Sequence, residues 1–239
     1  MFYFDKINGK KILKSDLIDN AFFTTREICI CDKGVNNNLE VKNNINIIEN
    51  YLGNNLISPT QTHSANIQIV KPLVKNYPDT DGLILIDNSQ AIFLNFADCV
   101  PLIFYDKKQN IGAISHAGWR GTAQKIGELT VKKLIQKFNS NINDICAVIG
   151  PAICENCYEV GEEVYSVFNP TKTKQEPTLY DRKVRKLNLK EINRKQLAQI
   201  GIKKIDICPY CTCCDNEYFF SYRKEHGTTL RHSAILALI

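Results

Sequence analysis

Residues 101–116 constrain the fold more than any other part of the chain. They read PLIFYDKKQNIGAISH, in which two apolar runs flank a short polar stretch. Strand-like runs joined by a polar turn are typical of an antiparallel hairpin. Folding the chain about Lys108 brings Cys99 beside residue 116 or 117, so that Cys99 and His116 share the open end of the hairpin, with Cα atoms on the order of 5 Å apart. Pro101 interrupts strand pairing near Cys99, so the pattern makes these residues neighbours without making them partners.

The turn after His116 carries an unusual set of side chains. It reads HAGWRGT and holds the sole tryptophan of the chain, Trp119, next to Arg120. A glycine turn that leads into a helix exposes backbone N–H groups and the positive end of the helix dipole, which suits an anion such as phosphate. The alternative is a tight turn in which Trp119 fills the core and Arg120 pairs with a carboxylate.

Cysteine and histidine at one end of a hairpin support two kinds of chemistry. His116 could deprotonate Cys99 for nucleophilic attack. Alternatively, thiolate and imidazole could both bind zinc, with a third protein ligand and an open position. That third ligand could be His63, in a polar loop before a strand, or one of the C-terminal histidines, His226 and His232, which we expect to be exposed.

Six of the other nine cysteines form a second candidate metal site. Residues 154–157 read CENC and residues 208–214 read CPYCTCC. Two such pairs can close a structural zinc site. The spacing of about fifty residues is loose for such a site, and cysteines in a strand would point in alternating directions. We therefore expect partly buried free thiols.

The order of secondary-structure signals predicts an α+β fold of mixed β-sheets with flanking helices, in one domain spanning residues 1–239. Runs of neighbouring strands followed by isolated helices favour this class over a doubly wound parallel sheet. The predicted strands are residues 66–70, 83–86, 91–96, 102–105, 111–115, 145–149, 205–207 and 218–222. The predicted helices are residues 44–52, 122–138, 161–168 and 189–200.

Charge, hydropathy and missing motifs exclude several classes of protein. A net charge of +5 is mild, and the basic run 182–195 carries leucines at helical spacing, which indicates an outer helix face and no nucleic-acid site. No apolar run reaches roughly 18 residues and the start lacks a leader pattern, so we expect a soluble, cytoplasmic protein away from membranes. Glycine-rich nucleotide loops, G-x-S-x-G and H-E-x-x-H are missing, as is the zinc nucleobase deaminase signature. Four histidines are too few for a multicopper oxidase site.

A series of motifs over roughly residues 59 to 236 resembles one family. In order, they are QTHSANI (61–67), TDGLI (80–84), ADCVPLIFYD (97–106), ISHAGWRGTAQKI (114–126), IGPAICENCYEVGEEV (149–164), LNLKEINRKQL (187–197) and FFSYRKEHGTTLR (219–231). The chain resembles the YfiH family, also called the laccase-domain or multicopper polyphenol oxidase family, whose members are regarded as purine nucleoside phosphorylases. The resemblance implies a sandwich with α/β/β/α layers.

The resemblance also implies a metal site and an activity. The metal ligands would be His63, Cys99 and His116, which would also be the catalytic residues. They would hold Zn²⁺, or Cu²⁺, with one coordination position open. The implied reactions are phosphorolysis of adenosine, inosine, guanosine and methylthioadenosine to the free base and ribose 1-phosphate, and deamination of adenosine to inosine. The implied partners are purine nucleosides and phosphate, and the chain could be a monomer or a homodimer.

Substrate contacts follow from chemistry within these motifs. Arg120, Arg223 and Arg231 are candidates for phosphate or ribose, and Asp98 could orient a ligand or a base nitrogen. Two departures from the family pattern bear on substrate range. Arg26 is followed by EICICDKG without the family's double glycine, and the family's T-G-R reads T-L-R at residues 229–231.

Three other functions remain open at this level. One is a metal-free cysteine hydrolase that uses Cys99 as nucleophile and His116 as base. Another is a copper-dependent polyphenol oxidase, and the third is a protein that binds purine nucleosides without turning them over.

Overall fold

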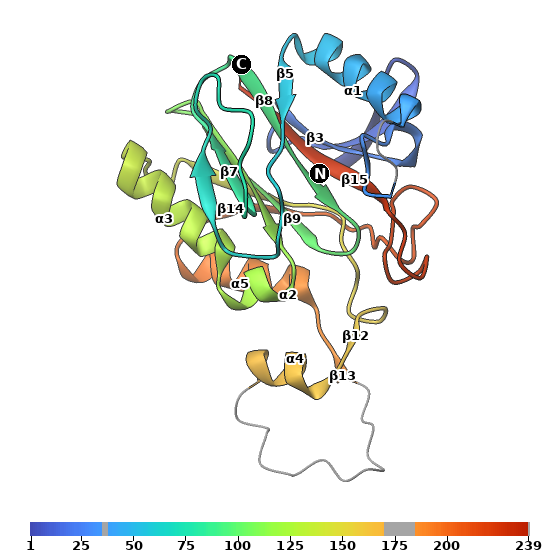
Figure 1. The fold of residues 1–239 in the computed structure, drawn as a ribbon. Helices are drawn as coiled ribbons and strands as arrows, with labels where there is room; N and C mark the ends of the chain where they lie inside the picture. Colours follow the sequence, from blue (N-terminus) through green and yellow to red (C-terminus); the bar gives the residue numbers. More distant parts are fainter. Residues whose placement is uncertain (35–37, 170–184, 239) are drawn as a thin grey trace.

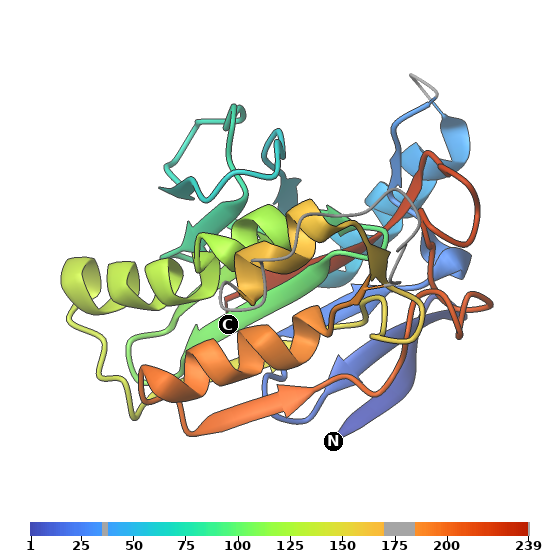
Figure 2. The same cartoon turned by 90° about the horizontal axis from the view of Figure 1, so that it is seen from below.

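Two large β-sheets pack face to face, and helices cover their outer faces (Figure 1). The computed structural model describes residues 1–34, 38–169 and 185–238. Three buried apolar clusters separate the layers: one between the sheets, one beneath the N-terminal helix, and one beneath the helices at residues 126–138 and 189–199. The predicted α+β fold with α/β/β/α layers is therefore confirmed, and Figure 2 shows it from below.

The first sheet joins the two ends of the chain. Its strands are, in spatial order, β1 (Phe2–Ile7), β2 (Lys10–Ser15), β3 (Ala21–Thr24), β15 (Leu230–Ala237), β8 (Gln90–Phe96) and β5 (Asn55–Ile57), with β4 (Cys31–Asp32) paired to β15. Helix α1 (Leu39–Leu52) covers its outer face, where Ile48 packs against Ile12, Phe93 and Ile235. Asn38 caps this helix by accepting the backbone N–H groups of Glu40 and Val41, which begins it five residues earlier than the predicted residue 44.

The second sheet contains the predicted hairpin. Its order is β14 (Lys204–Ile207), β11 (Ile145–Ile149), β9 (Val100–Asp106), β10 (Ile111–Ala117), β7 (Gly82–Leu85) and β6 (Ile67–Ile69). Helices α3 (Ile126–Phe138) and α5 (Leu189–Gln199) cover its outer face through Val131, Leu134 and Leu197. Apolar side chains on both faces of β9 and β10 are buried, which explains why their sequences are almost continuously apolar.

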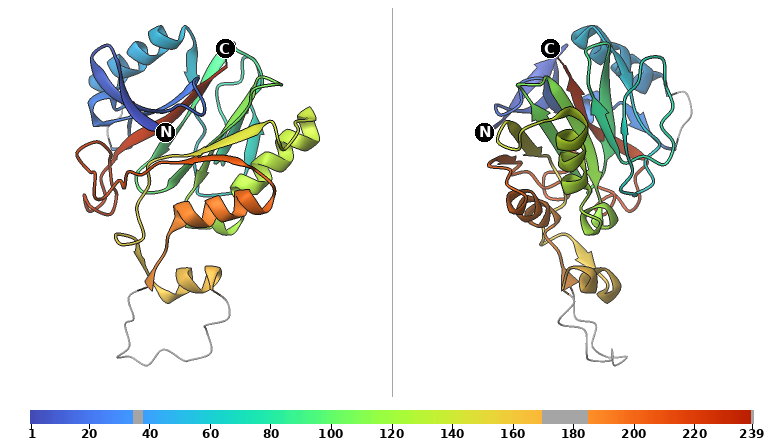
Figure 3. Two further views of the ribbon diagram at one scale, coloured as in Figure 1. Left: turned by 180° about the vertical axis from the view of Figure 1, so that it is seen from behind. Right: turned by 90° about the vertical axis from the view of Figure 1, so that its left-hand side faces the viewer.

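A smaller unit lies beside the sandwich. Strands β12 (Glu159–Val160) and β13 (Arg185–Lys186) form a two-stranded ribbon next to helix α4 (Glu162–Phe168). Figure 3 shows this unit below the two large sheets. Arg185 donates to Glu162 and stacks on Tyr165, which ties the ribbon to the helix.

The hairpin prediction is confirmed, with a small difference in register. Strands β9 and β10 pair antiparallel with His116 opposite Pro101 and Ala117 opposite Val100. The same register continued by one residue sets Cys99 opposite Gly118, whereas the predicted fold about Lys108 set it opposite residue 116 or 117. Cys99 and His116 nevertheless share the open end of the hairpin.

Two predicted elements are wrong in detail. Residues 218–222 form turns rather than a strand, because the backbone N–H groups of Tyr218 and Phe219 both bond to the carbonyl of Asp215. The predicted helix 122–138 is two helices, α2 (Trp119–Ala123) and α3, since Lys125 adopts a left-handed conformation with φ 57° between them. The apolar content of residues 218–222 reflects burial of Phe219 and Phe220 in a loop.

Two expectations from the sequence concern the surface of the molecule. No helix in the described ranges is long and apolar enough to cross a membrane. The basic run 182–195 begins outside the described residues, and its remainder includes α5, whose Arg194 pairs with Glu191 on the same helix.

Candidate active site and metal centre

The open end of the β9–β10 hairpin turns Cys99 and His116 toward the space between the sheets. Ile103 and Ile114 belong to the core between the sheets, and the two-residue period of a strand gives His116 the same inward direction as Ile114. Cys99 packs against the same core, and His116 is only 4% exposed. The structure therefore shows that the side chains of Cys99 and His116 face the same way, which the sequence left open.

His63 joins this pair from the loop before β6. Its backbone has φ 62°, a conformation rare for a non-glycine residue, and its ring meets that of His116 edge-on with centroids 4.8 Å apart. One ligand atom from each of His63, Cys99 and His116 lies within 4.8 Å of the others. His226 and His232 are not part of this cluster of described residues.

Asp81 holds both histidines in position. Its carboxylate, fully buried at the start of β7, accepts the backbone N–H groups of Thr62, His63 and Ser64 at 3.0, 3.1 and 2.7 Å. It also lies 2.8 Å from Nδ1 of His116. One carboxylate therefore fixes the His63 loop and orients the His116 ring. The prediction of site residues missed Asp81, although the TDGLI motif contains it.

The charges of the three residues favour a thiolate. Burial alone would raise the pKa of the Cys99 thiol, but the charge of His116 and hydrogen bonds with His116 and His63 lower it to about 6. Burial would lower the pKa of His116, but the charge of Cys99 and the hydrogen bond with Asp81 raise it to about 9. Cys99 and His116 thus stabilise each other as an ion pair.

Gly118 leaves the space that the cluster occupies. A Cβ atom at this position would lie 3.0 Å from Sγ of Cys99 and 3.2 Å from Cδ2 of His63. Its φ of −66° is ordinary, so the glycine serves close approach rather than backbone strain. The neighbouring Trp119 packs against the core under α3 and α5, and the Arg120 guanidinium lies 4.3 Å from its ring centroid. Trp119 is therefore a partly buried side chain packed against this core, close to the alternative interpretation of the turn, in which it fills the core.

A cavity of about 410 Å³ opens above the cluster. This volume is in the range of small-molecule sites. Its described lining residues are Lys33, Gln61, His63, Asn95, Ala97, Asp98, Cys99, His116, Tyr158, Tyr222, Arg223 and Arg231. Of the predicted substrate contacts, Asp98, Arg223 and Arg231 line the cavity, whereas Arg120 is not among its described lining residues. Lys33, Gln61, Asn95, Tyr158 and Tyr222 were not predicted. Gln61, Tyr158 and Tyr222 lie within the quoted motifs, but no local pattern shows that these side chains share a cavity.

Arg120 lies close to the cavity without lining it. Its side chain is exposed on α2. Burial raises the pKa of the Tyr158 phenol to about 12, against the opposing charges of Arg223 and Arg120. The charge of Arg120 therefore reaches one wall of the cavity from outside.

Asp98 and Arg223 are already engaged with the protein. The Asp98 carboxylate accepts the Thr212 hydroxyl and the Arg223 backbone N–H, both at 2.7 Å. The Arg223 guanidinium donates to the carbonyls of Cys157 and Glu159 and lies 5.5 Å from the ring centroid of Tyr158. Asp98 thus positions the loop that carries Arg223, rather than presenting an unengaged carboxylate to the cavity.

The C-terminal histidines differ from the expectation that both are exposed. His226 is exposed in a turn, but His232 is fully buried in the middle of the first sheet. The expectation for His232 is wrong because residues 230–237 form strand β15, which was not predicted. Burial lowers the pKa of His232 to about 3.

The donor set fits a metal ion. Two imidazoles and a thiolate can hold zinc with one position open, and the same donors suit copper. Since Asp81 engages Nδ1 of His116, Nε2 is left as the ligand atom, in the carboxylate–histidine–metal arrangement of many metal sites. Tetrahedral ligand atoms at 2.0–2.3 Å from zinc lie about 3.3–3.8 Å apart, so donors within 4.8 Å of one another need only a small closure.

Fold and site together define a class of two-sheet proteins with a His–Cys–His cluster at the end of a central hairpin. The crystal structure of the hypothetical protein YfiH of Bacillus licheniformis superimposes with a TM-score of 0.84 at 29% identity over 99% of both chains. A family model described as multi-copper polyphenol oxidoreductase laccase matches residues 30–239. The chain belongs to this family, the YfiH family, which confirms the resemblance in its motifs.

Two named relatives are similar over about two thirds of the chain or more. The purine nucleoside phosphorylase YlmD of Bacillus subtilis is 35% identical over 163 residues, which are 66% of this chain and 59% of that protein. The adenosine deaminase RL5 of an unknown prokaryotic organism is 31% identical over 187 residues, which are 71% of this chain and 70% of that protein.

Proposed function

We propose that the chain is a metal-dependent purine nucleoside phosphorylase that also deaminates adenosine. The observation that carries the proposal is the cavity, which combines the cluster of His63, Cys99 and His116 with aromatic and cationic walls. Relatives named purine nucleoside phosphorylase and adenosine deaminase support the same substrate class. Zinc is the metal that we assign, because two imidazoles and one thiolate leave an open position.

The walls suit the two ends of the reaction. Tyr158 and Tyr222 offer aromatic faces on which a purine can stack. Arg223, Arg231 and Lys33 offer positive charge for phosphate, with planar guanidinium groups suited to paired oxygens. Phosphorolysis needs an anion opposite the departing base, and these cations line the same cavity as the aromatic rings.

The cluster supplies the chemistry at the reacting atoms. A bound zinc ion would act as a Lewis acid toward an oxygen of the substrate or of water. The residues themselves hold the charges in place: Asp81 fixes the His116 ring, and His116 favours the thiolate of Cys99. Gln61 and Asn95 exchange two hydrogen bonds at the cavity wall, at 2.9 and 2.8 Å, which keeps the His63 loop against β8.

Product analysis tests the proposal. Purified protein would be incubated with inosine or adenosine, with and without phosphate, and the products identified by mass. Ribose 1-phosphate that requires phosphate would support phosphorolysis, and inosine formed from adenosine without phosphate would support deamination. If both nucleosides bound and neither changed, the chain would be a binding protein.

A cysteine hydrolase is the second candidate. The observation in its favour is the lowered pKa of Cys99, about 6, beside a histidine that could act as base. Such an enzyme would keep its activity after chelation and would purify without zinc. Loss of activity on chelation and its return with zinc would eliminate this candidate.

The family description also names a polyphenol oxidase activity. The donors His63, Cys99 and His116 suit copper as well as zinc. Copper-dependent oxidation of a phenol that survives removal of free copper would favour this activity over nucleoside chemistry.

A further inference from the structure

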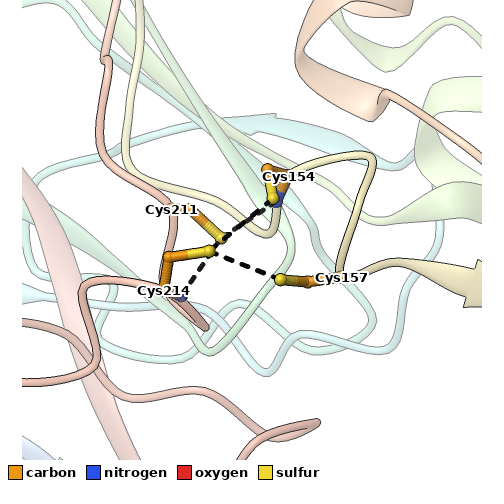
Figure 4. A group of neighbouring side chains, drawn as sticks. All are labelled: Cys154, Cys157, Cys211 and Cys214. Carbon is orange, nitrogen blue, oxygen red and sulfur yellow. Dashed lines mark hydrogen bonds between the residues drawn. The ribbon is translucent and has the colours of Figure 1, made fainter.

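Four cysteines gather in a second cluster away from the cavity floor. Cys154, Cys157, Cys211 and Cys214 have sulfur atoms that all lie within 4.8 Å of one another (Figure 4). Sγ of Cys214 lies 4.0 Å from that of Cys154 and 3.5 Å from that of Cys157. The expectation of partly buried free thiols is confirmed for Cys154, Cys157 and Cys211, whereas Cys214 is free but exposed. The structure adds that all four sulfur atoms point toward a common centre.

The fold explains why residues so distant in sequence meet. Strands β11 and β14 are parallel neighbours, so the loops that follow them leave the sheet at the same end. The N–H of Cys208 bonds to the carbonyl of Ile149 at 2.8 Å, and the N–H of Thr212 to the carbonyl of Ala152 at 3.3 Å. Each loop contributes two cysteines. The pairing of β11 with β14 therefore brings the two pairs of cysteines together although they are far apart in the sequence.

The arrangement matches the dimensions of a tetrahedral metal site. Zinc binds thiolates at about 2.3 Å, which sets the sulfur atoms about 3.8 Å apart. A disulfide needs an S–S distance of about 2.0 Å, whereas all four cysteines are free thiols. The sulfur of Cys211 also accepts the backbone N–H groups of Cys154 and Cys214 at 3.2 and 3.4 Å. We propose that these four cysteines bind a structural Zn²⁺ ion.

Nearby cations suit the charge of such a site. Binding replaces four thiol protons, which pass to solvent, and leaves a net charge of −2 on the zinc and its four thiolates. The ammonium of Lys190 donates to the carbonyls of Cys208 and Tyr210 in one of the two loops, at 2.9 and 3.0 Å. The guanidinium of Arg223 contacts the carbonyl of Cys157 in the other.

The zinc would fix one wall of the cavity. Tyr158 follows Cys157 directly, and Arg223 donates to the carbonyls on both sides of Tyr158. Thr212 lies between Cys211 and Cys214 and donates to Asp98, whose carbonyl accepts the N–H of Ile153. Loss of the ion would therefore loosen Tyr158 and Arg223 while leaving His63, Cys99 and His116 in place.

The direct test is metal content in a background that lacks the other candidate site. A His63→Ala/Cys99→Ala variant, grown with added zinc and dialysed under reducing conditions, should retain about one zinc per chain by mass spectrometry of metals. X-ray absorption at the zinc edge should show four sulfur ligands at about 2.3 Å. This result does not depend on the proposed nucleoside chemistry. A metal-free protein, or nitrogen and oxygen ligands around the zinc, would overturn the proposal.

Cysteine variants identify the ligands. In the same background, Cys157→Ser/Cys214→Ser should reduce zinc to near zero, while Cys213→Ser, in the same loop, should keep it. In otherwise wild-type protein, the double variant should retain the zinc held by His63, Cys99 and His116. Zinc that survives the double variant would contradict the assignment.

Thiol protection gives an answer even if the cysteine variants fail to fold. In native protein, Cys154, Cys157, Cys211 and Cys214 should resist alkylation together, and should become reactive together when a chelator removes zinc. Peptide mapping by mass spectrometry reads each site separately. Reaction of the exposed Cys214 at the same rate with and without chelator, or a disulfide within the group, would count against the metal.

Discussion

At the scale of single residues, Asp81 is the central feature of the site. It is fully buried and accepts bonds from three consecutive backbone N–H groups and from the His116 ring. The hydrogen bond from His116 and its charge keep the pKa of Asp81 far below its usual range, despite burial, which would raise it. A motif containing Asp81 was visible in the sequence, but its partners become apparent only when loop and strand meet.

Replacing Asp81 should weaken metal binding at the cluster of His63, Cys99 and His116. Asp81→Asn removes the charge that orients His116, and loss of such a partner typically costs 10–100-fold in metal affinity. Competition with a chromophoric chelator measures the affinity. Asp79→Asn is the matched control, since Asp79 is exposed and contacts Thr62 and Asn66 in the same loop. Equal affinity in both variants would refute this role of Asp81.

Gly118 should tolerate no side chain. Gly118→Ala sets a methyl group 3.0 Å from the Cys99 sulfur, and overpacking of this kind costs about 1–3 kcal/mol. We expect lower stability in urea and weaker metal binding, whereas Gln124→Ala, at an exposed position in the same turn region, should change neither. Unchanged metal affinity in Gly118→Ala would mean that the cluster is looser than the structure shows.

His232 should make the protein less stable in mild acid. Burial lowers its pKa from 6.5 to about 3 in the folded state. Below pH 6.5 the unfolded chain takes up a proton that the folded chain excludes. His232 therefore leaves the free energy of unfolding unchanged above that pH and lowers it progressively as the pH falls toward 3. The slope approaches about 1.4 kcal/mol per pH unit.

Replacing His232 should remove that slope. Urea unfolding of His232→Phe between about pH 6 and 4 should show a shallower decline than wild type. His226→Asn is the control, because His226 is exposed with φ 50° and asparagine tolerates that conformation. A wild-type slope in His232→Phe would assign the acid sensitivity to other groups.

At the scale of elements, the hairpin was predictable and its surroundings were not. Two apolar runs around a polar turn are a local signal, and β9 and β10 follow it closely. Residues 218–222 are equally apolar but form turns, because the backbone carbonyl of Asp215 accepts the N–H groups of Tyr218 and Phe219. Local composition indicates burial in both cases and cannot distinguish a strand from a buried loop.

The position of Arg231 at the start of β15 leads to a prediction about phosphate. Arg231 lines the cavity, whereas Arg120 is exposed on the five-residue helix α2. If the proposed site is correct, Arg231→Ala should raise the KM for phosphate at least tenfold, because it removes a charged group that we propose contacts the anion. Arg120→Ala is the matched control and should change it much less. A larger effect of Arg120 would favour an anion site at the turn after His116.

At the scale of the whole molecule, long-range pairing limits what the sequence can reveal. The last strand, β15, lies between β3 and β8 in the centre of the first sheet. No local signal indicates that residues 230–237 must pair with residues 21–24 and 91–96. The same limit applies to the four-cysteine cluster, which exists because β11 and β14 are neighbours. The resemblance to the family identified His63 as the third predicted metal ligand. The spacing of residues alone allowed His63, His226 or His232.

Phosphate dependence of nucleoside cleavage tests the proposed phosphorylase activity most directly. Metal-loaded protein would be incubated with inosine in phosphate buffer and in a phosphate-free buffer of equal ionic strength, and the sugar product measured by mass spectrometry. We expect hypoxanthine and ribose 1-phosphate in equal amounts with phosphate, little turnover without it, and loss of both products in Cys99→Ala. Release of hypoxanthine with free ribose in both buffers, or full activity in Cys99→Ala, would contradict it.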